Sequence, residues 1–330
     1  MQVVLHYRLK EVRWSIADAD LTRLRARFPD VTFVSVEDDD TLPAALADAE
    51  VYAGFHFPPD AFALAPKLRW VNSASAGVEA NLFPALAASD VVLTNAAGLH
   101  AVNIPEHALA LMLALGRNLH VAHRLQQARE WNRFAVIAAT GGIRELAGST
   151  LAVIGAGAIG LGIARLGAAL DMRVRVLRRR PEHPVPGAEA VVGPDDLHAL
   201  LAWADFVVLA APLTADTHDM IDAAAIAAMR SSTIFVNVGR GELVDDEALV
   251  AALRSGAIAA AGIDVFRDEP LPPESPYWEL ENVLVTPHVS GYRPDFFARV
   301  IAMFEDNLER WLRAVPLVNV VDKRLGYVVS

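Results

Sequence analysis

The chain of 330 residues contains no cysteine. It can therefore form no disulfide bond, no metal site with thiolate ligands and no covalent intermediate on a thiol, and this composition fits a reducing compartment. It also lacks a long apolar run, since the longest, residues 108–115, is too short to cross a bilayer. The N-terminus, where charges interrupt the first apolar residues, does not have the pattern of a signal peptide. We therefore expect a cytoplasmic protein without a membrane partner.

Positive charge is also scarce. The chain has 29 Lys and Arg against 40 Asp and Glu, a formal net charge of −11 and a pI near 5.4. This balance argues against nucleic acid as the main partner, and any anionic cofactor must be held by a local group of cations. What the chain does have is 54% hydrophobic residues, enough for large buried cores. Its length suggests two domains.

Short apolar runs alternate with helix-like runs in both parts of the chain, which predicts parallel α/β architecture throughout. In the first part, the strand-like runs are residues 3–7, 32–36, 51–53, 69–72 and 91–94, and the helix-like runs are 16–27 and 42–47. From residue 151 onward the strand-like runs are 151–154, 173–177, 206–209, 233–238, 259–264 and 283–285, and a last helix is expected over 294–314. Six strands of this second kind predict a doubly wound sheet.

A helix is expected just before this second part. Asn103 and Glu106 have the spacing of a capping box, and Pro105 suits a first helical turn. The following residues, 108–115, are apolar on nearly all sides, so this helix is predicted to be deeply buried or to lie at a subunit contact. His107 opens the helix, and a packed, hydrogen-bonded histidine is favoured there over a ligand-binding one.

A Gly-x-Gly-x-x-Gly motif, Gly155 to Gly160, lies between an apolar run and an Ala/Leu-rich stretch. Glycine at Gly155 and Gly157 lets the backbone turn sharply and approach a pyrophosphate, and a helix beginning near Ala158 and Ile159 offers free N–H groups to the phosphates. A second strand follows at the spacing of a βαβ unit, which favours dinucleotide binding. The alternative is a helix-packing turn that binds no ligand.

The end of that second strand bears on the choice of dinucleotide. NAD sites usually have Asp or Glu about 20 residues after the glycines, to bind the ribose 2′-hydroxyl. Here Arg178, Arg179 and Arg180 occupy the place, with Arg178 lying 23 residues after the first glycine. Guanidinium groups suit a 2′-phosphate, so NADP(H) is predicted as the preferred coenzyme, with NAD(H) as the alternative. A solvated basic loop is the other interpretation.

Three segments in the last third of the chain bring Arg240, Glu269 and His288 to the ends of apolar runs. A cation can hold the carboxylate of a 2-keto acid, an imidazole can move a proton to or from the oxygen at C2, and a carboxylate can keep that imidazole basic and correctly oriented. None of these groups accepts a hydride, so the hydride must come from a cofactor. Pro212 and Asp264 also follow strands, at the edge where open α/β sheets bind ligands.

With these motifs in place, the chain resembles the D-isomer-specific 2-hydroxyacid dehydrogenases over almost its whole length. The matching segments are residues 76–79, 94–100, 155–160, 211–214, 237–241, 262–266, 286–291 and 319–323. The resemblance implies two similar Rossmann-like or flavodoxin-like domains separated by a cleft that closes on the substrate. Residues 1–98 and 289–330 would form a discontinuous substrate-binding domain, and 99–288 the dinucleotide-binding domain. It also implies a homodimer joined through the coenzyme domains.

The resemblance also implies roles for single residues. Arg240 would bind the substrate carboxylate and keto oxygen, His288 would be the acid/base, and Glu269 would pair with His288; the chemistry of these side chains gives the same roles. The backbone N–H groups of Ala76 and Gly77 would complete the carboxylate cradle. The remaining positions concern the coenzyme: Asp264 would fix the nicotinamide carboxamide, Val238 and Gly291 would border the nicotinamide, and Pro212 and Thr217 would line the dinucleotide path.

Arg178 is the main departure from the commonest family pattern, because many members carry Asp there. Within the family this change resembles the NADP-using glyoxylate/hydroxypyruvate reductases, as does the segment 73–79. We therefore predict a reductase of small 2-keto acids with no metal. The alternative from another class is a non-enzymatic NAD(P)-sensing interaction protein, since corepressors also use this fold. The intact trio of Arg240, Glu269 and His288 favours catalysis.

Overall fold

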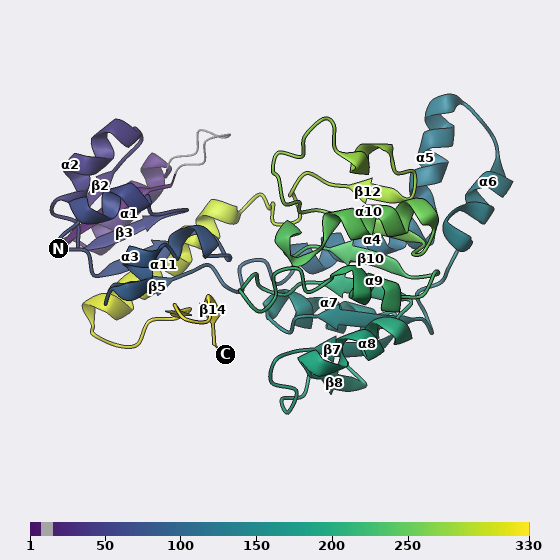
Figure 1. The fold of residues 1–330 in the computed structure, drawn as a ribbon. Coiled ribbons are helices and arrows are strands. Elements are labelled where there is room, and N and C mark those ends of the chain that lie inside the picture. The colour runs from purple at the N-terminus through teal and green to yellow at the C-terminus, as the bar shows by residue number, and fades with distance from the viewer. Residues whose placement is uncertain (8–15, 330) are drawn as a thin grey trace. The chain divides into compact units, whose positions relative to one another are not determined.

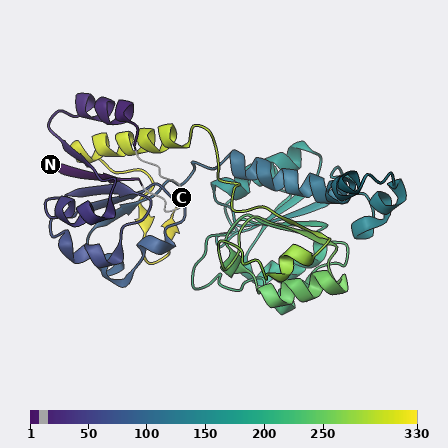
Figure 2. The same cartoon turned by 90° about the horizontal axis from the view of Figure 1, so that it is seen from above.

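The computed structural model describes residues 1–7 and 16–329, and the chain divides into two compact units (Figure 1). The first unit comprises Met1–Leu99 and Arg293–Ser330, and the second comprises His100–Tyr292. Each unit contains one parallel sheet with helices on both faces (Figure 2). The predicted class, two parallel-sheet α/β domains, is thus confirmed.

The sheet of the first unit has the strand order β2-β1-β3-β4-β5, and all its pairs are parallel. Its strands are β1 (Gln2–His6), β2 (Thr32–Ser35), β3 (Val51–Gly54), β4 (Trp70–Ser73) and β5 (Val92–Thr94). Alternate residues of β1 face opposite cores: Val3 and Leu5 pack under α1 (Asp18–Arg27) and α11 (Phe296–Leu312), whereas Val4 packs with α2 (Leu42–Leu46) and α3 (Pro84–Ala88). Both faces of the sheet are therefore buried, as parallel sheets require.

The C-terminal part of the chain completes this first unit. The Trp70 ring on β4 stacks on Phe304 and Trp311 of α11, with centroid distances of 5.7 and 5.5 Å. Beyond α11, a hairpin of β13 (Val321–Asp322) and β14 (Tyr327–Val328) follows, and the Lys323 ammonium donates hydrogen bonds to backbone carbonyls near the end of α3. The first unit is thus assembled from both ends of the chain.

The sheet of the second unit has the order β12-β11-β10-β9-β6-β7-β8. Its strands are β6 (Thr150–Ile154), β7 (Arg173–Leu177), β8 (Ala190–Val192), β9 (Phe206–Leu209), β10 (Ile234–Asn237), β11 (Ala260–Ile263) and β12 (Val283–Val285). The six predicted strands are present, and β8 is an edge strand that the sequence pattern did not reveal. The chain changes direction across the sheet between β6 and β9, the switch point at which such sheets bind ligands.

Helices cover both faces of this second sheet. On one face lie α4 (Asn103–Gly116) and α7 (Ala158–Ala169), and on the other lie α8 (Leu197–Trp203), α9 (Ala223–Ala228) and α10 (Asp246–Ser255). Short 3₁₀ helices occur in the connections of the two units, at Asp39–Thr41, Pro59–Leu64, Glu79–Asn81, Ala139–Gly141, Pro194–Asp196, Gly241–Leu243 and Pro276–Glu279.

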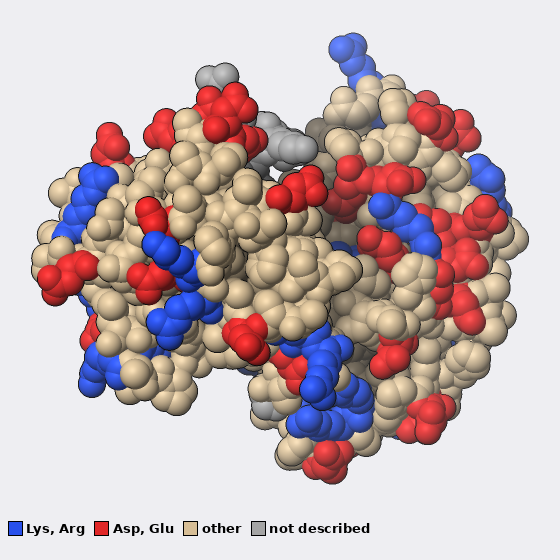
Figure 3. Space-filling view, turned by 60° about the vertical axis from the view of Figure 1, so that its left-hand side comes forward, with Lys and Arg blue, Asp and Glu red and all other residues tan. Residues whose placement is uncertain are grey.

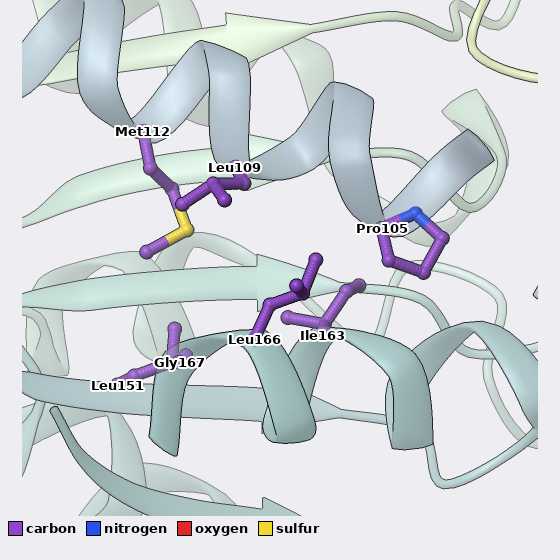
Figure 4. A pocket seen from close by; sticks show the side chains of 7 residues that line it. All are labelled: Pro105, Leu109, Met112, Leu151, Ile163, Leu166 and Gly167. Atoms are coloured by element: carbon purple, nitrogen blue, oxygen red, sulfur yellow. The ribbon is translucent and has the colours of Figure 1, made fainter. Parts of the chain in front are cut away.

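α4 buries one face and leaves Leu113 39% exposed, so the predicted deep burial holds only in part, and its predicted capping box is wrong. Val102 is the N-cap, no side chain caps the helix, and the Asn103 amide instead donates to the carbonyl oxygen of Ser290 at 2.8 Å. α4 packs closely on α7, because a Cβ at Gly162 would lie 2.6 Å from Pro105 Cγ. The small gap between these helices is lined entirely by apolar side chains and glycine (Figure 4), so we regard it as a packing seam.

Two helices that the sequence did not predict, α5 (Leu119–Ala128) and α6 (Arg133–Ala138), form an arm that projects from the second unit (Figure 1). The arm exposes large apolar side chains: Trp131 is 97% exposed and Phe134 is 68% exposed. Across residues 1–7 and 16–329, no helix combines the length and apolar character needed to span a bilayer.

Candidate active site

Three neighbouring parallel strands, β10, β11 and β12, bring the candidate catalytic residues to one edge of the second sheet. Arg240 follows β10, Glu269 lies in the loop after β11, and His288 follows β12. Because the carboxyl ends of parallel strands meet at the same edge, residues far apart in sequence come together here. The structure joins Glu269 to His288 directly.

The His288 ring is held by a carboxylate. Its Nδ1 lies 2.6 Å from Glu269 Oε2, while Glu269 Oε1 accepts the backbone N–H of Phe266 at 2.9 Å. Burial alone would raise the pKa of Glu269, but these hydrogen bonds and the charges of His288 and Arg240 outweigh it and leave the pKa below its ordinary value. The carboxylate is therefore ionised and accepts the Nδ1 proton. With Nδ1 occupied and the side chain 47% exposed, Nε2 is left to meet a ligand.

Asn237 shapes the turn that carries Arg240. Its Oδ1 accepts the N–H of Gly239 at 3.0 Å, and its Nδ2 donates to the carbonyl oxygen of Arg240 at 2.9 Å. The next residue, Gly241, lies so close to the 266–267 peptide that a Cβ would be 2.0 Å from the carbonyl carbon of Phe266. Only glycine allows this approach, which links the Arg240 turn to the loop that holds Glu269. The sequence analysis did not assign Asn237 a role. The signal available was an Asn two residues before a glycine, since Asn side chains commonly bind the backbone of turns.

The backbone around His288 is fixed by Asp264, which is fully buried. Its Oδ1 accepts the Thr286 hydroxyl at 2.6 Å and the N–H of Val289 at 3.0 Å, and its Oδ2 accepts the N–H of Ser290 at 3.1 Å. His288 itself has φ of +50°, a left-handed conformation that is uncommon outside glycine. The structure therefore shows Asp264 as the anchor of this loop, and its contact with a nicotinamide stays a prediction.

The glycine motif forms a tight turn at the switch point. Gly155 has φ of +102°, its N–H donates to Leu177 O at 2.9 Å, and a Cβ there would lie 2.7 Å from Ala210 O. A Cβ at Gly160 would lie 1.9 Å from Gly155 O, whereas one at Gly157 would meet open space. The first turn of α7, with Ala158 and Ile159, follows at once. Open space beside the free N–H groups of a helix start fits the pyrophosphate of a dinucleotide.

The arginine cluster lies beside this turn. Arg178 directly follows Leu177, whose carbonyl accepts the Gly155 N–H, and its own N–H donates to Val192 O on β8. Arg178 is half-buried, whereas Arg179 and Arg180 are exposed. Figure 3 shows basic side chains gathered at the end of the second unit where Figure 1 places β7 and β8. Cations at the end of the second strand of a βαβ unit fit a ribose 2′-phosphate.

The other predicted coenzyme residues lie at the same edge. Pro212, which is exposed, follows β9, and Thr217 closes this loop by donating its hydroxyl to Pro212 O at 2.7 Å. Val238 is buried directly after β10. Gly291 follows the His288 loop, where a Cβ would lie 3.5 Å from the His100 ring. Their contacts with the coenzyme stay predictions.

The predicted substrate loop belongs to the first unit. Ala76 and Gly77 come just after β4, and the loop is tied down by Asn95, whose amide donates to Ala76 O. Asn95 is thus a supporting residue that the sequence pattern did not single out. The role of Ala76 and Gly77 in binding a carboxylate stays a prediction. Among the residues that the structure describes, no group of three or more His, Asp and Glu side chains is arranged to hold a metal ion.

Comparison with known proteins identifies relatives of the chain. Residues 109–290 match the sequence model of the NAD-binding domain of D-isomer specific 2-hydroxyacid dehydrogenases. The chain is 38% identical to glyoxylate/hydroxypyruvate reductase B of Citrobacter koseri over 245 residues, which cover 74% of each protein. It is 32% identical to the glyoxylate reductase of Korarchaeum cryptofilum over 296 residues, covering 88% of this chain and 85% of the relative.

A solved structure agrees with these sequence relatives. The crystal structure of the NADPH-dependent glyoxylate/hydroxypyruvate reductase of Sinorhizobium meliloti, in complex with NADP and sulfate, superposes with a TM-score of 0.83 at 28% identity. The match covers 99% of each chain. The likeness therefore extends over both units and is not confined to the dinucleotide-binding motif.

Proposed function

The chain belongs to the D-isomer specific 2-hydroxyacid dehydrogenase family, and on that premise we propose that it reduces a small 2-keto acid of the glyoxylate or hydroxypyruvate type with NADPH. The observation that carries this proposal is the pair of His288 and the ionised Glu269, 2.6 Å apart, at the carboxyl edge of the dinucleotide-binding sheet. Glyoxylate/hydroxypyruvate reductases among the relatives support the substrate class.

Each of the three residues is proposed to have a separate role in the reduction. Bound NADPH supplies the hydride to C2 of the substrate. The Arg240 guanidinium binds the substrate carboxylate and polarises the keto oxygen. Protonated His288 delivers a proton from Nε2 to that oxygen, which converts the ketone to a hydroxyl group. Glu269 keeps the ring turned and stabilises the imidazolium through Nδ1. Oxidation of the hydroxy acid would follow the same path in reverse.

The coenzyme proposal rests on the second sheet. Gly155, Gly157, Ala158 and Ile159 would hold the pyrophosphate, and Arg178 with Arg179 would hold the 2′-phosphate, so NADP(H) is preferred over NAD(H). The remaining assignments are Asp264 to the carboxamide, Val238 and Gly291 to the nicotinamide faces, and Pro212 and Thr217 to the dinucleotide path. Accordingly, we assign dinucleotide binding to residues 99–288, and substrate binding to 1–98 with 289–330.

A homodimer in the cytoplasm is the proposed form of the protein. The arm of α5 and α6 supports it, because side chains as exposed as Trp131 and Phe134 are typical of surfaces that a partner covers. Light scattering after gel filtration tests this proposal: the mass of two chains is expected, and that of one chain would contradict it.

The activity itself is tested by NADPH oxidation with glyoxylate, hydroxypyruvate, pyruvate, phenylpyruvate and 2-ketoisocaproate. Turnover of the smallest substrates is expected. The alternative, a non-enzymatic NAD(P)-sensing protein, is not favoured by the intact trio or by the relatives. It predicts that NADPH binds and that none of the five acids is reduced.

A further inference from the structure

We propose that His107 is a positioning residue for the acid/base, acting through a hydrogen-bond chain that runs from His107 through Thr286 to Asp264. This chain fixes the loop 286–290, on which His288 stands. The inference deepens the proposed function and rests on it. His107 is not proposed to contact substrate or coenzyme, and its effect on the reaction passes through the backbone of the loop.

The direction of the chain follows from the hydrogens available. The Thr286 hydroxyl has one hydrogen, which goes to Asp264 Oδ1 at 2.6 Å because a carboxylate only accepts. The Thr286 oxygen therefore accepts a hydrogen bond from His107 Nε2, which lies 3.0 Å away. His107 Nε2 must carry a proton for this contact. The same nitrogen lies 3.6 Å from Asp264 Oδ1, so it also faces the carboxylate directly.

The buried carboxylate needs these donors. Asp264 is 0% exposed, and a buried charge is tolerated only where hydrogen bonds replace water. Two of its donors are the N–H groups of Val289 and Ser290, and the N–H of His288 donates to its backbone oxygen at 2.9 Å. If the hydrogen bond from Thr286 were lost, the Asp264 carboxylate would be held less firmly, and it is this carboxylate that accepts the N–H groups of Val289 and Ser290. The loop would then lose the left-handed backbone that aims the His288 ring at Glu269.

A second contact ties the same helix to the same loop. Asn103, one turn before His107 on α4, donates to Ser290 O at 2.8 Å. α4 therefore holds the loop at both ends, at Thr286 through His107 and at Ser290 through Asn103. The helix packs against β10 and β11, and its histidine is 22% exposed. These two contacts explain why Asn103 and His107 stand at the start of a helix whose later residues are apolar.

The test compares two replacements of His107 that differ in one property. In His107→Phe the ring stays and the donor is lost, whereas in His107→Gln the side-chain amide can donate from near the position of Nε2. Thr286→Val removes the next member of the chain. His198→Phe, an exposed histidine on α8, is the matched control. For each variant we would measure kcat and KM for hydroxypyruvate, the melting temperature, and amide hydrogen exchange of the peptide covering residues 286–292.

We expect His107→Phe and Thr286→Val to lower kcat about tenfold with KM changed less than about threefold, because the proton donor is misplaced and substrate binding is retained. Exchange at Val289 and Ser290 should accelerate while peptides of β6 and β7 stay protected. His107→Gln should recover kcat to within about threefold of wild type, and His198→Phe should match wild type.

Two results would overturn the inference. One is wild-type kcat and unchanged loop exchange in His107→Phe. The other is equal damage in His107→Phe and His107→Gln together with faster exchange throughout the second unit, which would mean that His107 only supports the fold. If the wild-type protein reduces no 2-keto acid, the proposed function fails, and the exchange experiment still decides whether the chain holds the loop.

Discussion

The two edges of the second sheet carry similar electrostatics but different chemistry. At the carboxyl edge, Glu269 pairs with His288, and at the amino edge, Asp205 accepts the N–H of Thr150 at 2.9 Å, its hydroxyl at 2.7 Å and a guanidinium N–H of Arg230 at 3.0 Å. Burial raises the pKa of both carboxyl groups, yet hydrogen bonds and nearby cations outweigh it and leave both below their ordinary values.

A lowered pKa therefore does not by itself identify a catalytic group. Asp205 faces a threonine and an arginine, neither of which exchanges protons near neutral pH, and it joins the starts of β6 and β9. Glu269 faces a histidine that is 47% exposed, and it lies at the carboxyl edge, where the charge of Arg240 also acts on it. The two carboxylates therefore differ in the side chains that they contact and in the edge of the sheet at which they lie. Because the strands are parallel, all carboxyl ends lie at one edge and all amino ends at the other.

The largest expected effect is at the carboxyl edge. His288→Ala should lower kcat by about 10²- to 10⁴-fold, because the variant lacks the imidazole that is proposed to deliver the proton. Affinity for NADPH, measured by quenching of protein fluorescence, should change little. Near-normal turnover in this variant would remove His288 from the mechanism.

A smaller loss is expected on replacing its partner. Glu269→Gln should lower kcat about 100-fold, since an amide holds the ring but does not stabilise the imidazolium. The melting temperature near pH 7 should change little. Because the pKa of Glu269 is lowered, its small contribution to stability is present above the ordinary glutamate value of about 4.5 and is lost as pH falls through the lowered one.

Glu274→Gln, an exposed residue of the same loop, is the control and should retain wild-type kcat. If Glu269→Gln and Glu274→Gln had equal kcat, the Glu269 carboxylate would have only a structural role, like that of Asp205.

The third effect concerns coenzyme choice. Arg178→Asp combined with Arg179→Ala should shift the ratio of kcat/KM for NADPH over NADH by about 10- to 100-fold toward NADH, because the phosphate loses its cations and the hydroxyl gains an acceptor. Arg165→Asp, an exposed arginine on α7, makes a similar charge change away from the cluster. An unchanged ratio in the double variant, matching that of Arg165→Asp, would place the 2′-phosphate elsewhere.

The smallest effect on catalysis is expected at the amino edge. Asp205→Asn should lower the free energy of unfolding by about 2 kcal/mol near pH 7, from weakened charge-assisted hydrogen bonds, and leave kcat/KM within twofold of wild type. Because the pKa of Asp205 is lowered, this stabilisation is present above its ordinary value of 3.8 and is lost as pH falls through the lowered one. Denaturant unfolding at pH 7 and at pH 3 measures the difference, which should shrink in acid.

If Asp205→Asn instead lowered kcat/KM as much as Glu269→Gln does, the distinction between the two edges would fail.

The sequence predicts the parts of this molecule that follow local patterns. Apolar runs marked six of the seven strands of the second sheet, and the Gly155 turn and the trio were found because residues with suitable side-chain chemistry follow strand ends. The edge strand β8, whose apolar run is only three residues long, was missed. The arm was missed because α5 buries only His120 and Val121 and α6 buries no residue, so no apolar stripe marks its helices.

The supporting contacts could not be predicted from the sequence, because they join residues that only the fold brings together. Thr286 and His107 lie 179 residues apart in sequence, and neither has a local pattern that predicts their hydrogen bond. Asn103 is the opposite case. Its local pattern predicted a helix cap, but its amide donates to the carbonyl oxygen of Ser290, which is distant in sequence. Local propensity was outweighed by a tertiary contact that only the fold creates.

Isotope labelling of the coenzyme follows the transferred hydrogen directly. Wild-type protein is given hydroxypyruvate and NADPH deuterated at the transferable C4 position, and the product is analysed by mass spectrometry. We predict glycerate with one deuterium at C2, formed in equal amount to NADP⁺, and at least 100-fold less of it with His288→Ala. If the wild-type protein binds NADPH but forms no labelled hydroxy acid, it does not transfer hydride from NADPH to this 2-keto acid.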